Sequence, residues 1–364
     1  MTDRVPFFDG HNDFLLRLMF TAGSREDVWR GSTKDGHLDL SRMKAGGFAG
    51  GLFAIFVPPI GNGPPPDFMK LMANPPYDLP LPPPMSPEAA QPFALRMAGL
   101  LHWMARSAPG DFAVCRTASQ VRAAIQNGMI AGLMHMEGAE AIGPDLDALY
   151  LFHDMGLRSL GPVWSRPTVF GHGVPMKFPG DPDIGPGLTE AGKDLVRLCN
   201  RLGILIDLSH MNAAGFEDVA HLSTAPLVAT HSNAHALCAS PRNLTGRQLD
   251  QIRDSGGMVG VNFATFYLRE DGRSSPDMGW DALLRHIDHL ISRLGEDHVG
   301  LGSDFDGCIV PNLIGDVTGV QGLFEALRRH GYDDALLGKL AMGNWLDCLS
   351  RSLHEPTENT RSAA

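Results

Sequence analysis

The chain has 364 residues, of which 43% are hydrophobic and 20% charged, and its formal net charge is −11. This composition is typical of a folded globular protein and excludes an extensively disordered chain. It has 41 acidic and 30 basic residues, and the Lys and Arg residues form no dense cluster. We therefore expect neither nucleic acid nor a membrane surface as a partner.

The N-terminal residues lack the apolar segment of a signal peptide, and no stretch reaches the roughly 18–20 apolar residues that a membrane span needs. The five cysteines are odd in number, scattered and never arranged as C-x-x-C, which argues against a disulfide framework or a structural zinc site. These features predict a protein of the reducing cytoplasm.

Eight short apolar runs, rich in Val, Ile, Leu and Phe, are distributed along the chain. They are residues 5–9, 51–57, 130–136, 157–163, 204–208, 226–230, 258–262 and 299–303. Most are continuously apolar rather than alternating, as expected for parallel strands that are buried on both faces.

Segments with helical spacing of apolar residues lie between these runs, at 94–107, 190–202, 246–255 and 280–294. The repeated strand–helix order predicts an α/β fold, a (β/α)₈ TIM-like barrel. The main competitor is a doubly wound open sheet, but no G-x-G-x-x-G turn follows the first run. We expect a single domain over residues 1–350 and a polar C-terminal tail over residues 351–364.

Residues 58–92 contain 13 of the 27 prolines. Proline fits neither a regular helix interior nor a central strand, so we predict an irregular insertion after the second strand of the barrel. There it would lie over the mouth at the carboxyl ends of the strands and shape substrate access. The alternative is a surface or subunit-contact loop without a role in chemistry.

Side chains of metal-ligand type follow five of the predicted strands, and in a barrel these strand ends meet at one mouth. They are His11, Asp13, Glu137, His210, His231 and Asp304. A single His or Asp at a strand end is more often a core or capping group, but the joint pattern is difficult to explain that way. His135 shares a strand face with Glu137 and is a further candidate to line the barrel.

Imidazole and carboxylate donors without a thiolate suit Zn²⁺, with Mn²⁺, Co²⁺ and Fe²⁺ as other possible occupants. His11 and Asp13 are two residues apart, so in an extended backbone they point the same way and can chelate one ion. His210 and His231 would hold a second ion. Glu137 would bridge the two zinc ions, about 3.5–4 Å apart, which would share an activated water.

Several sequence stretches resemble the membrane (renal) dipeptidase family of the amidohydrolase superfamily, nearly from end to end. They lie at 9–13 (DGHND), 136–138 (MEG), 200–210 (NRLGILIDLSH), 230–232 (THS), 238–243 (CASPRN), 261–263 (VNF) and 302–307 (GSDFDG). The occurrence of DGHND, IDLSH and GSDFDG in this order makes the resemblance highly specific.

The resemblance implies the same two zinc ions per chain, with Glu137 as the bridge. It also implies that Asp304 contacts the attacking water and the amino end of the substrate, and moves a proton to the leaving amine. Arg242 would hold the terminal carboxylate of the substrate, to which its planar fork of donors is suited. The implied substrate is a dipeptide, including one with a C-terminal D-residue, and the implied assembly is a homodimer.

One position departs from the renal-type members of the family, where the fourth strand is followed by a histidine that acts on the scissile carbonyl. Trp164 occupies this position and offers one N–H donor and no charge. Either that donor suffices, or Arg166 or His172 in the following loop takes over, or the substrate preference differs. We favour a different substrate preference.

The sequence thus predicts a binuclear zinc dipeptidase, and three alternatives stay open. The first is another binuclear hydrolase, such as a lactonase, a phosphotriesterase-like enzyme or an N-acyl amino acid amidohydrolase. The second is a non-catalytic metal- or ligand-binding relic. The third is a metal-free barrel enzyme such as a phosphate-binding lyase, but that would need a glycine-rich loop where Asp304 stands.

Overall fold

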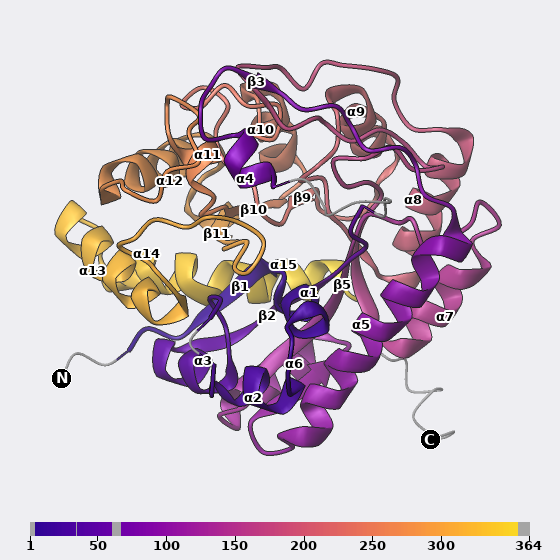
Figure 1. The fold of residues 1–364 in the computed structure, drawn as a ribbon. Helices are drawn as coiled ribbons and strands as arrows, with labels where there is room; N and C mark the ends of the chain where they lie inside the picture. The colour runs from indigo at the N-terminus through magenta and orange to yellow at the C-terminus, as the bar shows by residue number, and fades with distance from the viewer. Residues whose placement is uncertain (1–3, 34, 60–66, 356–364) are drawn as a thin grey trace.

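The computed structural model describes residues 4–33, 35–59 and 67–355, and eight parallel strands form a nearly closed barrel at its centre (Figure 1). In chain order these strands are β1 (Phe7–Asn12), β2 (Phe48–Phe56), β5 (Ile130–Glu137), β6 (Leu157–Gly161), β8 (Leu205–Ile206), β9 (Val228–Ala229), β10 (Met258–Val261) and β11 (Val299–Leu301). Their spatial order is β8-β6-β5-β2-β1-β11-β10-β9, and the Asp207–Val228 bridge joins the two ends. The predicted (β/α)₈ barrel is confirmed.

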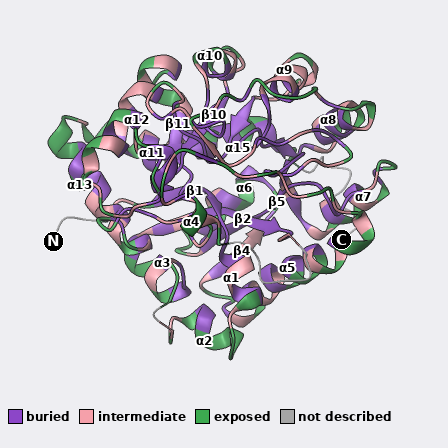
Figure 2. Ribbon diagram, turned by 45° about the horizontal axis from the view of Figure 1, so that its top comes forward, coloured by how far each residue is buried: buried purple, intermediate pink, exposed green. Residues whose placement is uncertain are grey.

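Each predicted apolar run overlaps one of these strands, and every residue of β1 and β5 is buried. A ninth strand, β4 (Phe112–Cys115), pairs in parallel beside the start of β5 and was not predicted. Strands covered on both sides explain the continuous apolar runs, because water contacts neither face. Figure 2 shows the buried strands in the interior, with exposed residues on the outer surfaces of the helices.

Helices pack around the outside of the strands (Figure 1). The predicted helices are α5 (Pro87–Ser107), α8 (Glu190–Leu202), α10 (Gly246–Asp254) and α12 (Trp280–Leu294). The others are α1 (Phe14–Phe20), α2 (Arg25–Arg30), α3 (Leu40–Gly46), α4 (Phe68–Leu71), α6 (Ala118–Gln126), α7 (Asp147–Met155), α9 (Ala213–Leu222), α11 (Thr265–Leu268), α13 (Val320–His330), α14 (Asp334–Gly338) and α15 (Asn344–Ser352). Among the described residues, none of these helices is long and apolar enough to cross a membrane. All five cysteines are buried and unpaired.

The proline-rich segment is shorter than predicted, because α5 begins at Pro87 and includes Pro92. A proline at the first helical position needs no N–H partner and its ring already holds a helical φ, which explains this start. The expectation of irregular structure up to residue 92 is therefore wrong for residues 87–92. Residues 60–66 of this segment lie outside the described residues.

The rest of the segment is anchored to loops at the carboxyl ends of other strands. Its short strand β3 (Tyr77–Asp78) pairs antiparallel with β7 (Lys177–Phe178), which lies in the chain between β6 and α8. The backbone carbonyl of Met69 accepts a hydrogen bond of 2.6 Å from Ser274 Oγ, in the chain after β10. The insertion therefore lies across the mouth of the barrel, as predicted.

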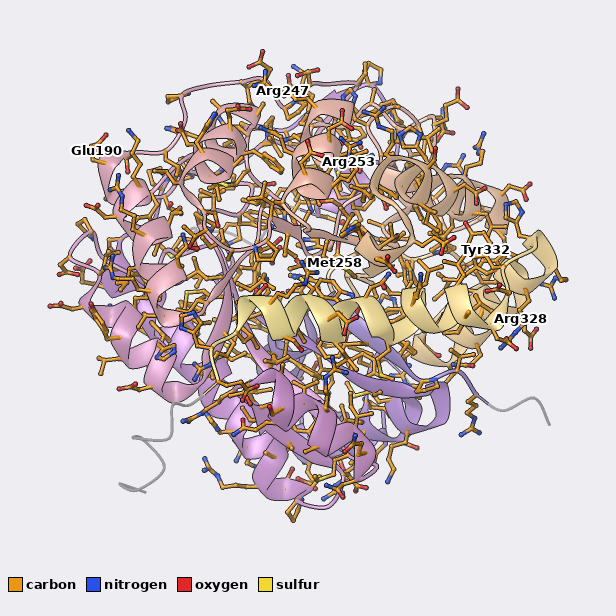
Figure 3. All side chains as sticks on the ribbon, turned by 180° about the vertical axis from the view of Figure 1, so that it is seen from behind. Glu190, Arg247, Arg253, Met258, Arg328 and Tyr332 are labelled. Carbon is orange, nitrogen blue, oxygen red and sulfur yellow. The ribbon has the colours of Figure 1, made fainter. Side chains whose placement is uncertain are left out.

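The amino ends of the strands are covered by α15, seen as the yellow helix across the back of the molecule in Figure 3. Its Trp345 is fully buried against Phe8 and donates a hydrogen bond of 2.8 Å to the Leu301 carbonyl. The helix continues to Ser352 and Leu353 is buried, so the fold extends beyond residue 350, where the tail was expected to begin. Residues 356–364 of that tail lie outside the described residues.

Replacing Trp345 should test how far this helix supports the barrel. We expect Trp345→Ala to lower the free energy of unfolding by about 3–5 kcal/mol, because it leaves a large cavity. Trp345→Phe should cost less, about 1–3 kcal/mol, since it mainly leaves the Leu301 carbonyl without its donor. Urea unfolding followed by circular dichroism measures both. Leu151→Ala, at a side chain that is 68% exposed, is the control, and a Trp345→Ala loss no larger than that of the control would contradict the prediction.

Candidate metal centre

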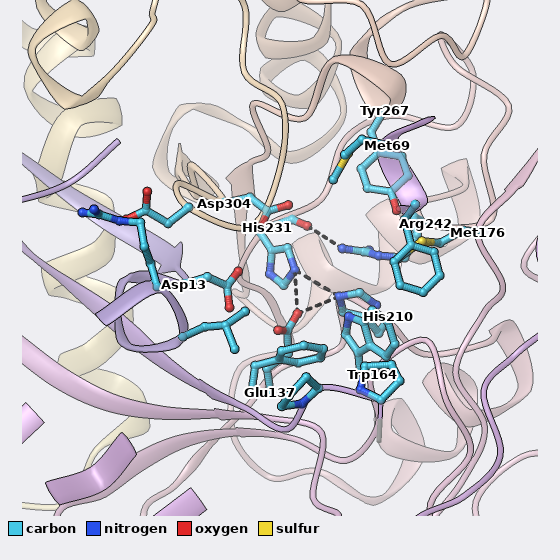
Figure 4. A pocket seen from close by; sticks show the side chains of 18 of the residues that line it. Asp13, Met69, Glu137, Trp164, Met176, His210, His231, Arg242, Tyr267 and Asp304 are labelled. Atoms are coloured by element: carbon cyan, nitrogen blue, oxygen red, sulfur yellow. Dashed lines mark hydrogen bonds and ion pairs between the residues drawn. The ribbon is translucent and has the colours of Figure 1, made fainter. Parts of the chain in front are cut away.

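The barrel brings the predicted ligands together at the carboxyl ends of its strands. Figure 4 shows all of them except His11. β1 supplies one ligand and the residue after it a second, β5 ends on the third, and the chain just after β8, β9 and β11 supplies the rest. They are His11, Asp13, Glu137, His210, His231 and Asp304. The first five are buried, and Asp304 is partly exposed to a cavity. Residues far apart in the sequence thus meet because parallel strands end on the same side of the barrel.

The two oxygens of the Glu137 carboxylate face different partners. Its Oε1 lies 2.8 Å from His210 Nε2 and 3.4 Å from His231 Nε2, and these two nitrogens are 3.2 Å apart. Its Oε2 lies 3.8 Å from His11 Nε2, which is 3.6 Å from Asp13 Oδ2. This division into two donor pairs is the arrangement that the bridging hypothesis requires.

The donor set fits bound divalent cations. Both ring nitrogens of His11 and Oδ1 of Asp13 are buried and have no hydrogen-bond partner among the described residues. Burial opposes the charge of His11, yet Glu137 and Asp13 raise its pKa to about 10, whereas burial raises the pKa of Glu137 itself well above the usual value. Burying carboxylates side by side destabilises the folded protein, as does burying ring nitrogens that have no hydrogen-bond partner. A bound cation would offset both effects.

Hydrogen bonds behind the ligands fix how two histidines are presented. Thr230 Oγ1 donates to Asp207 Oδ2 at 2.7 Å, so it can only accept from His231 Nδ1, 2.8 Å away. His231 Nδ1 then carries the proton, and the lone pair on Nε2 faces Glu137. Ser165 Oγ lies 3.1 Å from Nδ1 of His210. The Thr230 contact thus supports a neutral His231 with a free Nε2, the form that binds a metal, whereas the Ser165 hydroxyl can either donate to or accept from His210.

The network around Asp207 was not recognised from the sequence. The Asp207 carboxylate also accepts hydrogen bonds from the Ser209 backbone and hydroxyl, at 3.1 and 2.6 Å. His135 Nε2 lies 3.6 Å from it, and the His135 ring packs edge-on against His11 at 5.2 Å. His135 thus lines the barrel interior beside the metal ligands, as its strand face suggested. The signal for Asp207 was its place in the IDLSH stretch, three residues before a ligand.

A cavity of about 660 Å³ is lined by the predicted ligands other than His11, and also by Arg242 and Trp164. Its lining residues are Asp13, Leu16, Arg17, Phe20, Phe56, Pro58, Pro59, Phe68, Met69, Phe93, Glu137, Trp164, Met176, His210, His231, Arg242, Phe266, Tyr267, Asp304, Asp306 and Gly307. A cavity of this size accommodates a small organic ligand such as a dipeptide.

Asp304 is held at the cavity by its neighbours. Its Oδ2 accepts a hydrogen bond of 3.0 Å from Asn262 Nδ2, a partner that was missed although it lies in the VNF stretch. Burial raises the pKa of Asp304 to about 6, although His11 opposes this. A Cβ at Gly307 would stand 2.1 Å from Asp13 Oδ2 and 2.5 Å from Asp304 Oδ1, so only glycine lets these carboxylates lie there.

Arg242 is buried in the cavity wall, and part of its hydrogen-bonding capacity is already used. Its Nη2 donates to the His231 carbonyl at 3.2 Å, and its Nη1 donates to the Ser209 carbonyl. The guanidinium lies over the Tyr267 ring, 5.3 Å from the centroid. Its Nε is buried and has no partner among the described residues, so the hydrogen-bonding capacity of the guanidinium is not fully used within the protein.

The structure separates the three candidates for the missing family histidine. Trp164 lines the cavity, with its ring 5.9 Å from that of His210. Arg166 is buried behind it in an ion pair with Glu140, with Nη2 2.8 Å from Oε1, and does not line the cavity. His172 also lies outside the lining, so of the three only Trp164 reaches the site.

Comparison with known proteins agrees with this geometry. The family model for membrane dipeptidase, peptidase family M19, matches residues 1–360. A metallo peptidase from Rhodobacter sphaeroides, solved with a phosphinate mimic of the dipeptide L-Ala-D-Ala, is 62% identical with a TM-score of 0.94, covering 96% of this chain and 100% of that one. The probable dipeptidase PvdM from Pseudomonas aeruginosa is 25% identical with a TM-score of 0.80, covering 96% of each chain.

A dipeptidase of Claviceps purpurea, tcpJ, is 27% identical over 302 residues, which are 82% of this chain and 65% of that protein. The family model matches nearly the whole chain. The matched range includes the strands of the barrel, the donor cluster and the residues that line the cavity. The chain therefore belongs to the membrane dipeptidase family.

Proposed function

We propose that the protein is a metal-dependent dipeptidase that holds two zinc ions per chain, bridged by Glu137. The observation that supports this most directly is that the two oxygens of Glu137 face two separate donor pairs, at 2.8 and 3.8 Å from the nearest nitrogens. His11 and Asp13 would hold one ion, and His210 and His231 the other. When bound, these ions supply a water that is activated near neutral pH and a Lewis acid for the scissile carbonyl.

The protein residues position the dipeptide and move the proton. Asp304 accepts a proton from the attacking water and returns it to the leaving nitrogen, the role of a carboxylate within reach of both. Arg242 binds the C-terminal carboxylate through the donors that its backbone contacts leave free. Because its guanidinium is anchored to the Ser209 and His231 carbonyls, it lies at a fixed place relative to the centre. The site therefore selects a substrate whose carboxylate is one residue past the scissile bond.

A second candidate is an N-acyl amino acid amidohydrolase, because Arg242 would bind the carboxylate of that substrate equally well. Asp304 distinguishes the two, since a carboxylate beside the cavity favours a free amino group. The unpaired buried cysteines fit the predicted cytoplasmic location. The homodimer stays a prediction from the family resemblance.

Metal content and hydrolysis, measured on the same sample, test the proposed function. We expect close to two zinc ions per chain and hydrolysis of L,L- or L,D-dipeptides, with lower rates on N-acylated amino acids and lactones. Glu137→Gln should weaken both metal sites together and lower kcat/KM by more than about 100-fold, since outer partners of metal ligands alone often account for 10–100-fold. Glu190→Gln, at an exposed side chain on α8, is the control. Two zinc ions with normal turnover in Glu137→Gln would remove the bridging role.

Replacing Arg242 tests whether it binds the terminal carboxylate. We expect Arg242→Ala to lower kcat/KM for dipeptides by about 100-fold or more, because it removes a buried charged partner. Dipeptides amidated at the C-terminus should lose much less. Arg247→Ala removes a mostly exposed arginine from the same part of the chain and serves as the control. An equal loss on both substrates would mean that Arg242 acts only by bracing the Ser209 and His231 carbonyls.

Replacing Thr230 tests the hydrogen bond behind His231. Thr230→Val keeps the shape but removes the hydroxyl between His231 and Asp207, so we expect zinc affinity to fall about 10–100-fold. Thr230→Ser retains the hydroxyl and should restore the affinity. Competition with a chromogenic chelator measures both. If Thr230→Val and Thr230→Ser bound zinc equally well, the hydroxyl would have no role in presenting His231.

A further inference from the structure

Three aromatic side chains form one wall of the cavity beside the metal centre, which we call the aromatic wall: Phe56, Phe68 and Trp164. The Trp164 ring meets Phe56 at 4.9 Å and Phe68 at 6.3 Å between centroids, in edge-to-face contacts. They come from the end of β2, from α4 in the insertion and from the loop after β6. Figure 4 shows Trp164 beside His210, so the wall borders the reacting part of the cavity.

Apart from the metal-centre residues, Arg242 and Asp304, the cavity has only two charged residues among those described, and they neutralise each other. Arg17 Nε lies 3.0 Å from Asp306 Oδ2, and the Arg17 guanidinium also donates to the backbone carbonyls of Asp35 and Leu38. The remaining lining residues other than Gly307 are Leu16, Phe20, Pro58, Pro59, Met69, Phe93, Met176, Phe266 and Tyr267, together with the aromatic wall. Residues 60–66 include no Asp, Glu, Lys or Arg in the sequence.

The position of Trp164 is fixed by its surroundings. A backbone bridge pairs it with Arg166, whose guanidinium lies 5.8 Å from the Trp164 ring centroid and is locked in the buried ion pair with Glu140. A second donation of 2.7 Å from Arg166 Nη2 to the Val57 carbonyl ties the loop after β6 to the residue that follows Phe56. The part of the wall formed by Trp164 and Phe56 is therefore held in place before substrate binds.

We propose that the aromatic wall binds an apolar side chain of the substrate, so that the enzyme selects dipeptides with aliphatic or aromatic residues over those with Asp, Glu, Lys or Arg. This inference rests on the proposed dipeptidase function and names its substrate class. An apolar side chain gains from leaving water against Phe56, Phe68 and Trp164. A charged side chain loses its hydration there and finds no opposite charge free to pair with it.

The test compares two series of dipeptides, X-Ala and Ala-X, with X as Leu, Phe, Glu or Lys, using zinc-loaded enzyme. We expect kcat/KM for Leu and Phe to exceed that for Glu and Lys by about tenfold or more in at least one series, mainly through KM. Trp164→Ala and Phe68→Ala should each reduce this ratio several-fold. Leu71→Ala, at a 51% exposed residue of the same helix as Phe68, should leave the ratio unchanged.

The outcomes distinguish the proposed selectivity from the proposed dipeptidase function. Hydrolysis of both series with similar kcat/KM for every X would overturn the selectivity while the dipeptidase function stands. The proposed selectivity would also be overturned if both Trp164→Ala and Phe68→Ala, at full zinc content, kept the preference for Leu and Phe over Glu and Lys. Absence of hydrolysis in every series, with zinc bound, would instead overturn the proposed function. Should Trp164→Ala not fold, Phe68→Ala carries the same comparison, because Phe68 is only half-buried.

Discussion

The structure is organised around one buried carboxylate. Glu137 ends β5 inside a ring of apolar strands, where an isolated negative charge would be severely destabilised. Burial raises its pKa well above the usual value, whereas His11, whose own pKa is raised to about 10 by Glu137 and Asp13, opposes that shift. The two zinc ions that we propose would stabilise the ionised carboxylate. The strand order of the barrel, which brings β1, β8 and β9 to the same mouth as β5, is what makes the arrangement possible.

The hydrogen bonds around this centre connect the proposed metal ligands to Arg242. Arg242, the residue expected to bind the substrate carboxylate, donates to the carbonyls of Ser209 and His231, which lie next to or on the metal ligands. Asp207 holds the hydroxyl of Thr230 and the backbone of Ser209 at the same time. The distance between carboxylate recognition and the reacting centre is thereby set by a few short, buried contacts. Under the proposed function, these contacts would let the site select a substrate of dipeptide length.

Much of this arrangement is predictable from the sequence, because continuous apolar runs and the polar residues that follow them reflect burial along single strands. The five proposed ligands were selected in this way, and the structure brings them together even though β8 and β9 are only two residues long. Side-chain contacts between segments that are distant in the sequence produce no such local pattern. Nothing local indicates that Thr230 connects His231 to Asp207, or that Arg166 is used up by Glu140. The helical start at Pro87 was missed because proline was treated as a helix breaker, although it is favoured in a first turn.

The proposed reaction chemistry and the proposed substrate selectivity depend on different parts of the chain. The proposed ligands and Asp304 lie at or just after strand ends, where the barrel fixes them, whereas much of the cavity wall comes from loops and the proline-rich insertion. A substitution on a loop can exchange a polar group for an aromatic one without disturbing any ligand. The ring of Trp164 packs against Phe56 and Phe68, which is why we propose that it acts on the substrate side chain. In these proposals, the reaction chemistry depends on the strand ends of the barrel. The substrate selectivity depends on the loops and the proline-rich insertion that cover its mouth.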